Sequence, residues 1–211
     1  MNKNDRQALA KHFVILVIFS ALFQLIQAVC GLTLWVSVGS QVLLIFGLAA
    51  LVGALREGIL AIRIFQHDFT SGYFVNNSSR RLLGVLGASY LLVGVAAILF
   101  GVQGLVKGER HLASLLGVGL AAIALLVIPI IGSFMKALAI ELRSAALSSA
   151  SVHTFGDSYL SMVLLISLLI NAGTDLWWGD ALGAIVMAPY LIQQGIQTLL
   201  NLSGPGFQED M

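Results

Sequence analysis

The sequence predicts an all-α membrane protein built as a bundle of six transmembrane helices. Of its 211 residues, 58% are hydrophobic and only 10% are charged, whereas soluble domains carry roughly 25% charged residues. The few charges gather in short groups, and long apolar runs separate them. Because a helix needs roughly 20 apolar residues to cross a bilayer, each of these runs can be a span.

The groups of charges mark the individual spans. The first stretch without Asp, Glu, Lys or Arg, 12–55, is too long for one crossing and must fold back. We expect its turn at 35–40, where a tryptophan precedes serine and glycine. Pro129 and Pro189 should kink the fourth and sixth spans, and Asp180 is placed to cap the sixth. The predicted spans are 13–34, 41–64, 82–105, 112–135, 148–174 and 181–202.

Basic residues predict the orientation of these spans. Eight of the 11 lysines and arginines fall on one side: Lys3, Arg6, Lys11, Arg63, Arg80, Arg81, Lys136 and Arg143. The opposite side has only Lys107 and Arg110. The positive-inside rule therefore predicts a protein of the cytoplasmic membrane with both termini in the cytoplasm. Segments 1–12 and 203–211 are expected to be short cytoplasmic ends of a transmembrane domain covering 13–202.

Several classes of function are disfavoured by the composition. A single cysteine, Cys30, allows no internal disulfide and no thiolate metal cluster. A net charge of +1 gives no reason to expect a nucleic-acid partner. The buried polar residues are too few for a nucleophile, a base and oxyanion donors together, so we do not expect an enzyme. No permanently bound cofactor is expected. The helices are predicted to contact the lipid bilayer.

Four ionisable residues lie within predicted spans, namely Arg56, Glu57, His153 and Asp157. Such residues are costly in a membrane and are candidates for function. His153 and Asp157 are four residues apart, so both leave the same face of one helix. An imidazole and a carboxylate at this spacing can provide half of a zinc site. The alternative is that they hydrogen-bond each other or the nearby backbone.

Two motifs, one from His153 to Asp157 and one from Trp177 to Asp180, together resemble the transmembrane domain of the cation diffusion facilitator superfamily. The segment His153-Thr154-Phe155-Gly156-Asp157 resembles its fifth-span H-x-x-x-D motif. Trp177-Trp178-Gly179-Asp180 resembles the entry to its sixth span, with Ala181 where proline is usual. Segments 39–48 and 127–147 resemble a membrane-only branch. The resemblance implies a cation-efflux bundle, often a homodimer, that exports zinc or another divalent cation as its transported substrate in exchange for protons.

The second span departs from this family pattern. The family has two metal ligands there, and the matching positions are Ala49 and Gly53. The family also has an Asp three residues before the fifth-span motif, and the matching residue here is Ala150. Glu57 continues the series Ala49, Gly53 at i, i+4 and i+8, so it lies one turn further along nearly the same face. We therefore predict a shifted metal site made of Glu57, His153 and Asp157. Alternatively, Arg56 and Glu57 lie near the inner headgroups, where they snorkel or pair with Arg63 and Arg81.

Three functions remain open from the sequence. The first is efflux of a divalent cation, with zinc as the leading candidate and proton exchange as the driving force. The alternative is a non-transporting interaction or regulatory subunit that retains the fold. The third is transport of an organic or lipid substrate, which predicts a roomy apolar cavity lined by Ala49 and Gly53. In each case, buried glutamines such as Gln24 and Gln27 are expected to bond between helices, and the many glycines predict close helix packing.

Overall fold

The structure is a computed structural model that describes residues 3–66, 77–108, 114–142, 145–174, 176 and 178–203. These residues form an all-α fold, as predicted. The predicted tail beyond Ser203, Arg110 and the side chains of Arg63, Arg80 and Trp177 lie outside the described part. The helices are α1 (Lys3–Val38), α2 (Gln41–Gln66), α3 (Asn77–Lys107), α4 (Leu115–Glu141), α5 (Ala145–Thr174) and α6 (Trp178–Ser203).

Five of these helices, α1 to α5, are long and apolar enough to cross a membrane within the described residues. The chain is therefore a multi-pass membrane protein. The sixth helix, α6, has 26 residues, as many as α2. It carries Gln193, Gln194 and Gln197 in its second half, which lowers its mean hydropathy. The length of α6 is sufficient for a transmembrane span, but its composition indicates a span less clearly than that of the other five helices.

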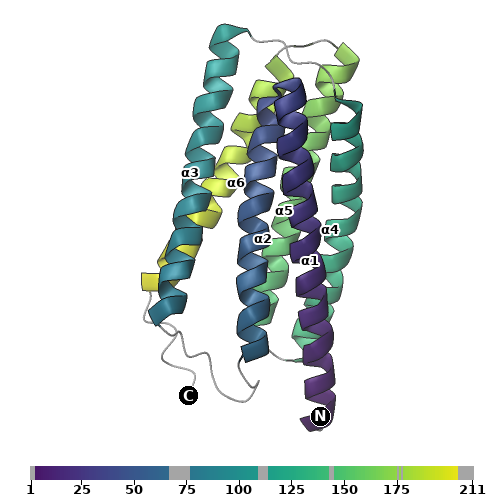
Figure 1. The fold of residues 1–211 in the computed structure, drawn as a ribbon, viewed down its shortest axis with the longest axis vertical. Coiled ribbons are helices and arrows are strands. Elements are labelled where there is room, and N and C mark those ends of the chain that lie inside the picture. The colour runs from purple at the N-terminus through teal and green to yellow at the C-terminus, as the bar shows by residue number, and fades with distance from the viewer. Residues whose placement is uncertain are drawn as a thin grey trace.

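Successive helices run in opposite directions along one long axis (Figure 1). The start of α1 and the end of α6 consequently lie at the same end of the bundle, here called the terminal end. The opposite end, here called the turn end, holds the α1–α2 connection. There Gly39 has a φ of +79°, a left-handed conformation that glycine adopts without strain. The turn falls inside the predicted segment 35–40, although α1 extends four residues beyond the predicted end of its span at 34, whereas α2 begins at the predicted residue 41.

The helices pack as three closest pairs, α1 with α2, α4 with α5 and α3 with α6. Glycines permit the close approach of α3 and α6. A Cβ atom added at Gly87 would lie 3.2 Å from the carbonyl oxygen of Gly195, and one added at Gly195 would lie 2.9 Å from that of Gly87. The prediction of close packing is confirmed here and at Gly94 and Gly101. It is wrong at Gly119, where an added Cβ would meet nothing within 4 Å.

Asp180 has a different role from the predicted one. It lies inside the first turn of α6 instead of preceding that helix. Its carboxylate accepts a hydrogen bond from the backbone N–H of Gln41 at 2.7 Å and another from the hydroxyl of Ser40. These donors belong to the start of α2, where backbone N–H groups lack partners within the helix. Asp180 therefore ties α6 to the beginning of α2 at the turn end.

Two clusters of buried apolar side chains form the core. The larger lies toward the turn end and includes Phe46 and Val52 of α2 with Leu160 and Leu164 of α5. The smaller lies toward the terminal end and includes Phe13, Ala61, Ile131, Met135, Ala139 and Leu147. Along α2 and α5 a short polar stretch separates the two clusters. The candidate site lies in this stretch.

Candidate functional site

A layer of buried and partly buried polar side chains crosses the bundle between the two apolar clusters. We call this set the polar layer: Gln24 of α1, Arg56 and Glu57 of α2, and Thr154 and Asp157 of α5. Gln24 and Glu57 each expose only 2% of their surface. From Glu57 to the end of α2 at Gln66, nine residues at 1.5 Å each give about 14 Å. The layer is therefore deep in the bundle, in the half nearer the terminal end.

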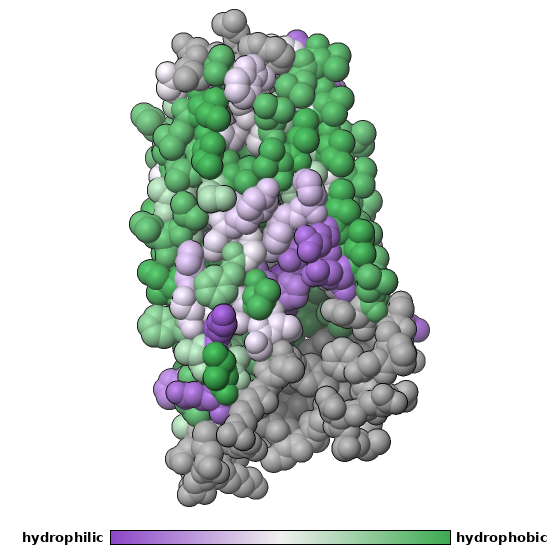
Figure 2. Space-filling view, turned by 180° about the vertical axis from the view of Figure 1, so that it is seen from behind, coloured by the Kyte–Doolittle hydropathy of each residue, from purple (hydrophilic) through white to green (hydrophobic). Residues whose placement is uncertain are grey.

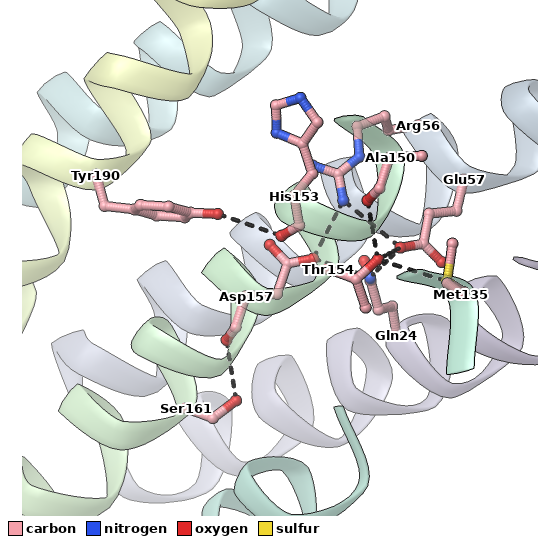
Figure 3. A network of polar contacts seen from close by, with 10 residues as sticks. All are labelled: Gln24, Arg56, Glu57, Met135, Ala150, His153, Thr154, Asp157, Ser161 and Tyr190. Carbon is pink, nitrogen blue, oxygen red and sulfur yellow. Dashed lines mark hydrogen bonds and ion pairs between the residues drawn. The ribbon is translucent and has the colours of Figure 1, made fainter. Parts of the chain in front are cut away.

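Gln24 joins the two acidic residues of the layer (Figure 3). Its Nε2 donates to Oε1 of Glu57 at 3.0 Å and to Oδ2 of Asp157 at 3.0 Å. One amide group thus holds carboxylates from two different helices close together. The expectation that Gln24 bonds between helices is confirmed. The structure also brings together Glu57 and Asp157, two of the three predicted site residues.

Arg56 supplies the positive charge of the polar layer. Its Nη2 lies 3.2 Å from Oδ2 of Asp157 and 3.5 Å from Oε1 of Glu57. The side chain of Arg56 is 15% exposed, that of Glu57 3% and that of Asp157 12%. The arginine is thus an internal partner of both acids, and neither acid is left without a countercharge. Of the two alternatives for Arg56 and Glu57, the structure shows pairing, but with each other and with Asp157.

Two hydroxyl groups, Ser20 of α1 and Thr154 of α5, also hydrogen-bond with the carboxylate of Glu57. The hydroxyl of Thr154 lies 3.3 Å from Oε1 of Glu57 and 3.2 Å from the backbone carbonyl of Ala150. Met135 packs behind it, with its sulfur 3.7 Å from the same hydroxyl. Oε1 of Glu57 is therefore surrounded by donors. By contrast, Oε2 of Glu57 is buried without a hydrogen-bond partner in the described part of the chain.

Gly53 makes room for the amide group of Gln24. A Cβ atom added at Gly53 would collide with Oε1 of Gln24. Ala49 and Glu57, on the same face of α2, are also buried, at 3% and 2% exposure. The predicted shared face of these three residues is confirmed. At Gly53, where the family pattern has a ligand, the space is filled by a side chain from α1.

His153 is held apart from the two acids. In Figure 3 its ring points away from the carboxylates, and the guanidinium of Arg56 lies between. The imidazole hydrogen-bonds with Gln194 of α6, while its Nδ1 has no partner in the described residues. The hydroxyl of Tyr190 lies 3.5 Å from the backbone carbonyl of His153. Of the alternatives for the His153–Asp157 pair, no direct bond between these side chains is present.

A metal site would need three or more suitable side chains in reach of one ion. No such group of His, Cys, Asp and Glu occurs within the described residues. The structure instead has two carboxylates, Glu57 and Asp157, that share hydrogen-bond donors, with the guanidinium of Arg56 in contact with both. Carboxylates so placed can exchange a proton or a cation, because either can neutralise the second negative charge.

A small cavity adjoins the polar layer on the side of the turn end. Its volume is about 10 Å³, and it is lined by Gln24, Gln27, Phe46, Ala49, Ala50, Asp157 and Leu160. This is close to the smallest space that holds one water molecule. Oε1 of Gln24 and Nε2 of Gln27 are buried there without partners among the described residues. These polar atoms make the cavity suited to a water molecule or a small ion.

Two members of the polar layer, Arg56 and Gln24, have partners that the sequence alone did not predict. Arg56 was identified, but its direct contact with Asp157 was not foreseen. Its position beside Glu57 in an otherwise uncharged run was the available signal. Gln24 was expected to bond between helices, but its partners were not foreseen. The glycine four residues before Glu57 was the signal that another side chain enters at that level.

The comparisons with known proteins add no assignment to this geometry. No family model matches the chain, and no curated protein shows significant similarity to it.

Proposed function

We propose that the protein is a membrane transporter that exports a divalent metal cation, with zinc as the leading candidate, in exchange for protons. The proposal rests on the pairing of two carboxylates from different helices, the buried Glu57 and the partly buried Asp157, around one amide donor. Ionisable groups inside a membrane protein are costly and typically mark a path for ions or protons. Here they converge on one point within the bundle.

The charge of the polar layer favours a cation over an anion as the substrate. Two ionised carboxylates and one guanidinium leave one net negative charge. A proton or a cation can neutralise that charge, and the two compete for the same oxygens. Such competition is the simplest physical basis for exchange, because binding of one species releases the other. The unpartnered Oε2 of Glu57 is the oxygen that either species would reach.

The orientation in this proposal has all six helices crossing the membrane and both termini in the cytoplasm. Lys11 of α1 and Lys136 of α4 lie in the halves of their helices toward the terminal end, and Lys107 lies at the turn end of α3. The excess of basic residues toward the terminal end supports a cytoplasmic location for it. The polar layer then lies in the cytoplasmic half of the bundle. The homodimer implied by the resemblance stays a prediction.

Access to the polar layer is proposed to come through the face formed by α5 and α6. Gln193 and Gln197 are exposed on α6, and His153 is half-buried on α5. Polar side chains interrupt the otherwise apolar surface at mid-height on this side of the bundle (Figure 2). His153 is one turn from Asp157 on the same helix, so a change of its side-chain rotamer would turn the imidazole toward the acids as a third ligand.

Transport measured in lipid vesicles tests this proposal. Purified protein in vesicles that contain a zinc indicator should carry zinc when a pH gradient is imposed. Glu57→Gln and Asp157→Asn should each reduce the initial rate about tenfold or more, because each removes one of the two charges that attract the ion. Glu141→Gln removes an exposed acid at the end of α4 and should leave the rate unchanged. Unchanged rates in both buried variants would exclude the polar layer from transport.

The second candidate is a non-transporting membrane subunit. The observation in its favour is that Gln24 and Arg56 already bind Oε1 of Glu57 and Oδ2 of Asp157. Such bonds are expected where polar residues only hold helices together. Its discriminating measurement is a zinc titration of the purified protein. A wild-type protein that neither binds nor carries zinc, manganese, cobalt or iron supports this candidate.

The third possibility, a large organic or lipid substrate, predicted a roomy apolar cavity at Ala49 and Gly53. The structure gives this possibility no support, because Ala49 borders the small cavity and Gly53 packs against Gln24. A cavity of about 500 Å³ lies between α1 and α2. Its lining includes the exposed Leu22 and Leu55, so it opens on the lipid-facing side of the bundle.

A further inference from the structure

The guanidinium of Arg56 occupies the space between the groups that would have to bind a cation. Its Nη2 contacts Asp157 at 3.2 Å and Glu57 at 3.5 Å, and Figure 3 shows it between these acids and the ring of His153. We propose that Arg56 is a tethered cation that competes with the transported ion, and that binding of the ion requires the guanidinium to leave the polar layer. This inference rests on the proposed function.

The attachment of Arg56 is suited to reversible release. An arginine can bind a carboxylate through two nitrogens at once, but here both acids are reached by Nη2. Nη1 is buried without a hydrogen-bond partner in the described part of the chain. The side chain is also the most exposed of the three charged groups. One nitrogen therefore holds a long, partly exposed side chain in place.

The charges allow one cation or the other, but not both. With Arg56 in place, the two carboxylates retain one negative charge. A divalent ion in place of the guanidinium neutralises both acids completely. If both cations stayed, the layer would have an excess positive charge at short range in a medium of low dielectric constant, where repulsion between charges is strong. The arginine would therefore have to withdraw as the ion enters.

Withdrawal of Arg56 would also explain the position of His153. The guanidinium is near enough to act electrostatically on the imidazole, and it separates that ring from Asp157 in Figure 3. Once Arg56 has left, the path for the ring of His153 toward Asp157 is open. The three-residue set Glu57, His153 and Asp157 then forms only in the ion-bound state. Arg56 therefore controls when the ion can bind between Glu57 and Asp157.

Zinc binding to the purified protein tests this inference directly. Arg56→Gln keeps a polar side chain but removes the competing charge, so zinc should bind about tenfold or more tightly than to the wild type. Arg81→Gln removes an exposed arginine at the start of α3 and serves as the matched control, with unchanged affinity. The double variant Arg56→Gln/Glu57→Gln should lose the gain. Equal or weaker binding by folded Arg56→Gln would overturn the inference.

A second measurement uses the wild-type chain and does not depend on the folding of a variant. The arginine reagent phenylglyoxal, followed by mass spectrometry of the modified peptide, reports whether Arg56 is accessible. Zinc should increase the modification of Arg56 and leave that of Arg81 unchanged. Unchanged or reduced modification at zinc concentrations that saturate binding would contradict the proposed withdrawal.

The two proposals can fail separately in these experiments. If wild-type vesicles carry no zinc but Arg56→Gln gains binding that depends on Glu57, the transport function is wrong and the competition is correct. If the wild type carries zinc while Arg56→Gln shows no gain, the transport function stands and the competition is wrong.

Discussion

Gly53 controls what can enter the polar layer from α1. Any side chain at this position would collide with the amide of Gln24, and this amide holds Glu57 and Asp157 together at 3.0 Å each. One missing Cβ atom therefore permits two buried hydrogen bonds to charged groups. Hydrogen bonds of this kind each contribute about 1.5–3 kcal/mol.

A glycine-to-alanine pair of variants tests this role. Gly53→Ala should displace Gln24 and lower the free energy of unfolding by about 1–3 kcal/mol, because it breaks buried bonds to the two acids. Gly58→Ala is the control, since an added Cβ there meets nothing within 4 Å and alanine favours the helix. Thermal unfolding in detergent, followed by tryptophan fluorescence, measures both. If the two variants were equally stable, Gly53 would not be needed to position Gln24 between the two acids.

The residues of the site could be predicted from sequence only in part. Helical spacing correctly placed Ala49, Gly53 and Glu57 on one buried face of α2. It did not predict that Gln24 fills the gap at Gly53, because α1 is distant in the sequence and its rotation depends on packing. The spacing of His153 and Asp157 fixes their shared side of α5 but not the rotamer of the imidazole. The metal site built from these residues therefore stays a prediction.

The pairing of α3 with α6 depends on small residues at regular positions. Gly87, Gly94 and Gly101 recur every seven residues along α3, and each would meet α6 if it carried a Cβ atom. This seam lets the two backbones approach closely, which is a common way to pack helices in membranes. The seam keeps α3 and α6 together as a unit beside the other four helices.

A larger side chain in this seam should separate the pair. Gly94→Leu should lower the free energy of unfolding by about 1–3 kcal/mol through overpacking, because even a Cβ atom would lie 2.7 Å from Cγ1 and 3.1 Å from the backbone nitrogen of Ile192. Gly119→Leu, at an open position on α4, should leave stability nearly unchanged. Thermal unfolding of both variants in the same detergent measures the difference. A stable, native-like Gly94→Leu variant would show that the seam tolerates expansion.

The helices themselves were more predictable than their ends. Groups of charge and the Gly39-Ser40 turn located every helix, because a membrane excludes charges from spans. The helices nevertheless extend beyond the apolar runs, as α1 does by beginning at Lys3. Polar residues outside the hydrocarbon can continue a helix, so hydropathy marks the membrane and not the helix terminus. Asp180 was misplaced for a related reason: sequence shows that a cap is available, but not which helix it caps.

The two ends of the bundle are closed to different degrees. At the turn end, Asp180 of α6 binds Ser40 and the first residue of α2, Gln41, and Gly104 of α3 packs against the side chain of Gln41. At the terminal end, α3 and α6 lean away from the end of α2 (Figure 1). The polar layer lies in this half of the bundle. In the proposed orientation, this arrangement corresponds to a transporter that is closed toward the outside.

The proposed transport function predicts that the turn end opens between α2 and the pair α3–α6. A disulfide between Gln41→Cys and Gly104→Cys, in a Cys30→Ser background, should prevent this opening. A Cβ atom at Gly104 would lie 3.0 Å from Cδ of Gln41, so the two positions face each other across the contact between α2 and α3, where a disulfide needs Cβ atoms about 3.5–4.5 Å apart. Oxidation should reduce zinc transport about tenfold or more, and a reducing agent should restore it. Zinc binding from the cytoplasmic side should persist in the oxidised protein, because the polar layer lies in the other half.

Each single-cysteine variant should transport normally under both conditions. A cross-linked protein that transports at the wild-type rate would show that the ion does not leave through a gap between α2 and α3, and alternating access at this end would have to be abandoned.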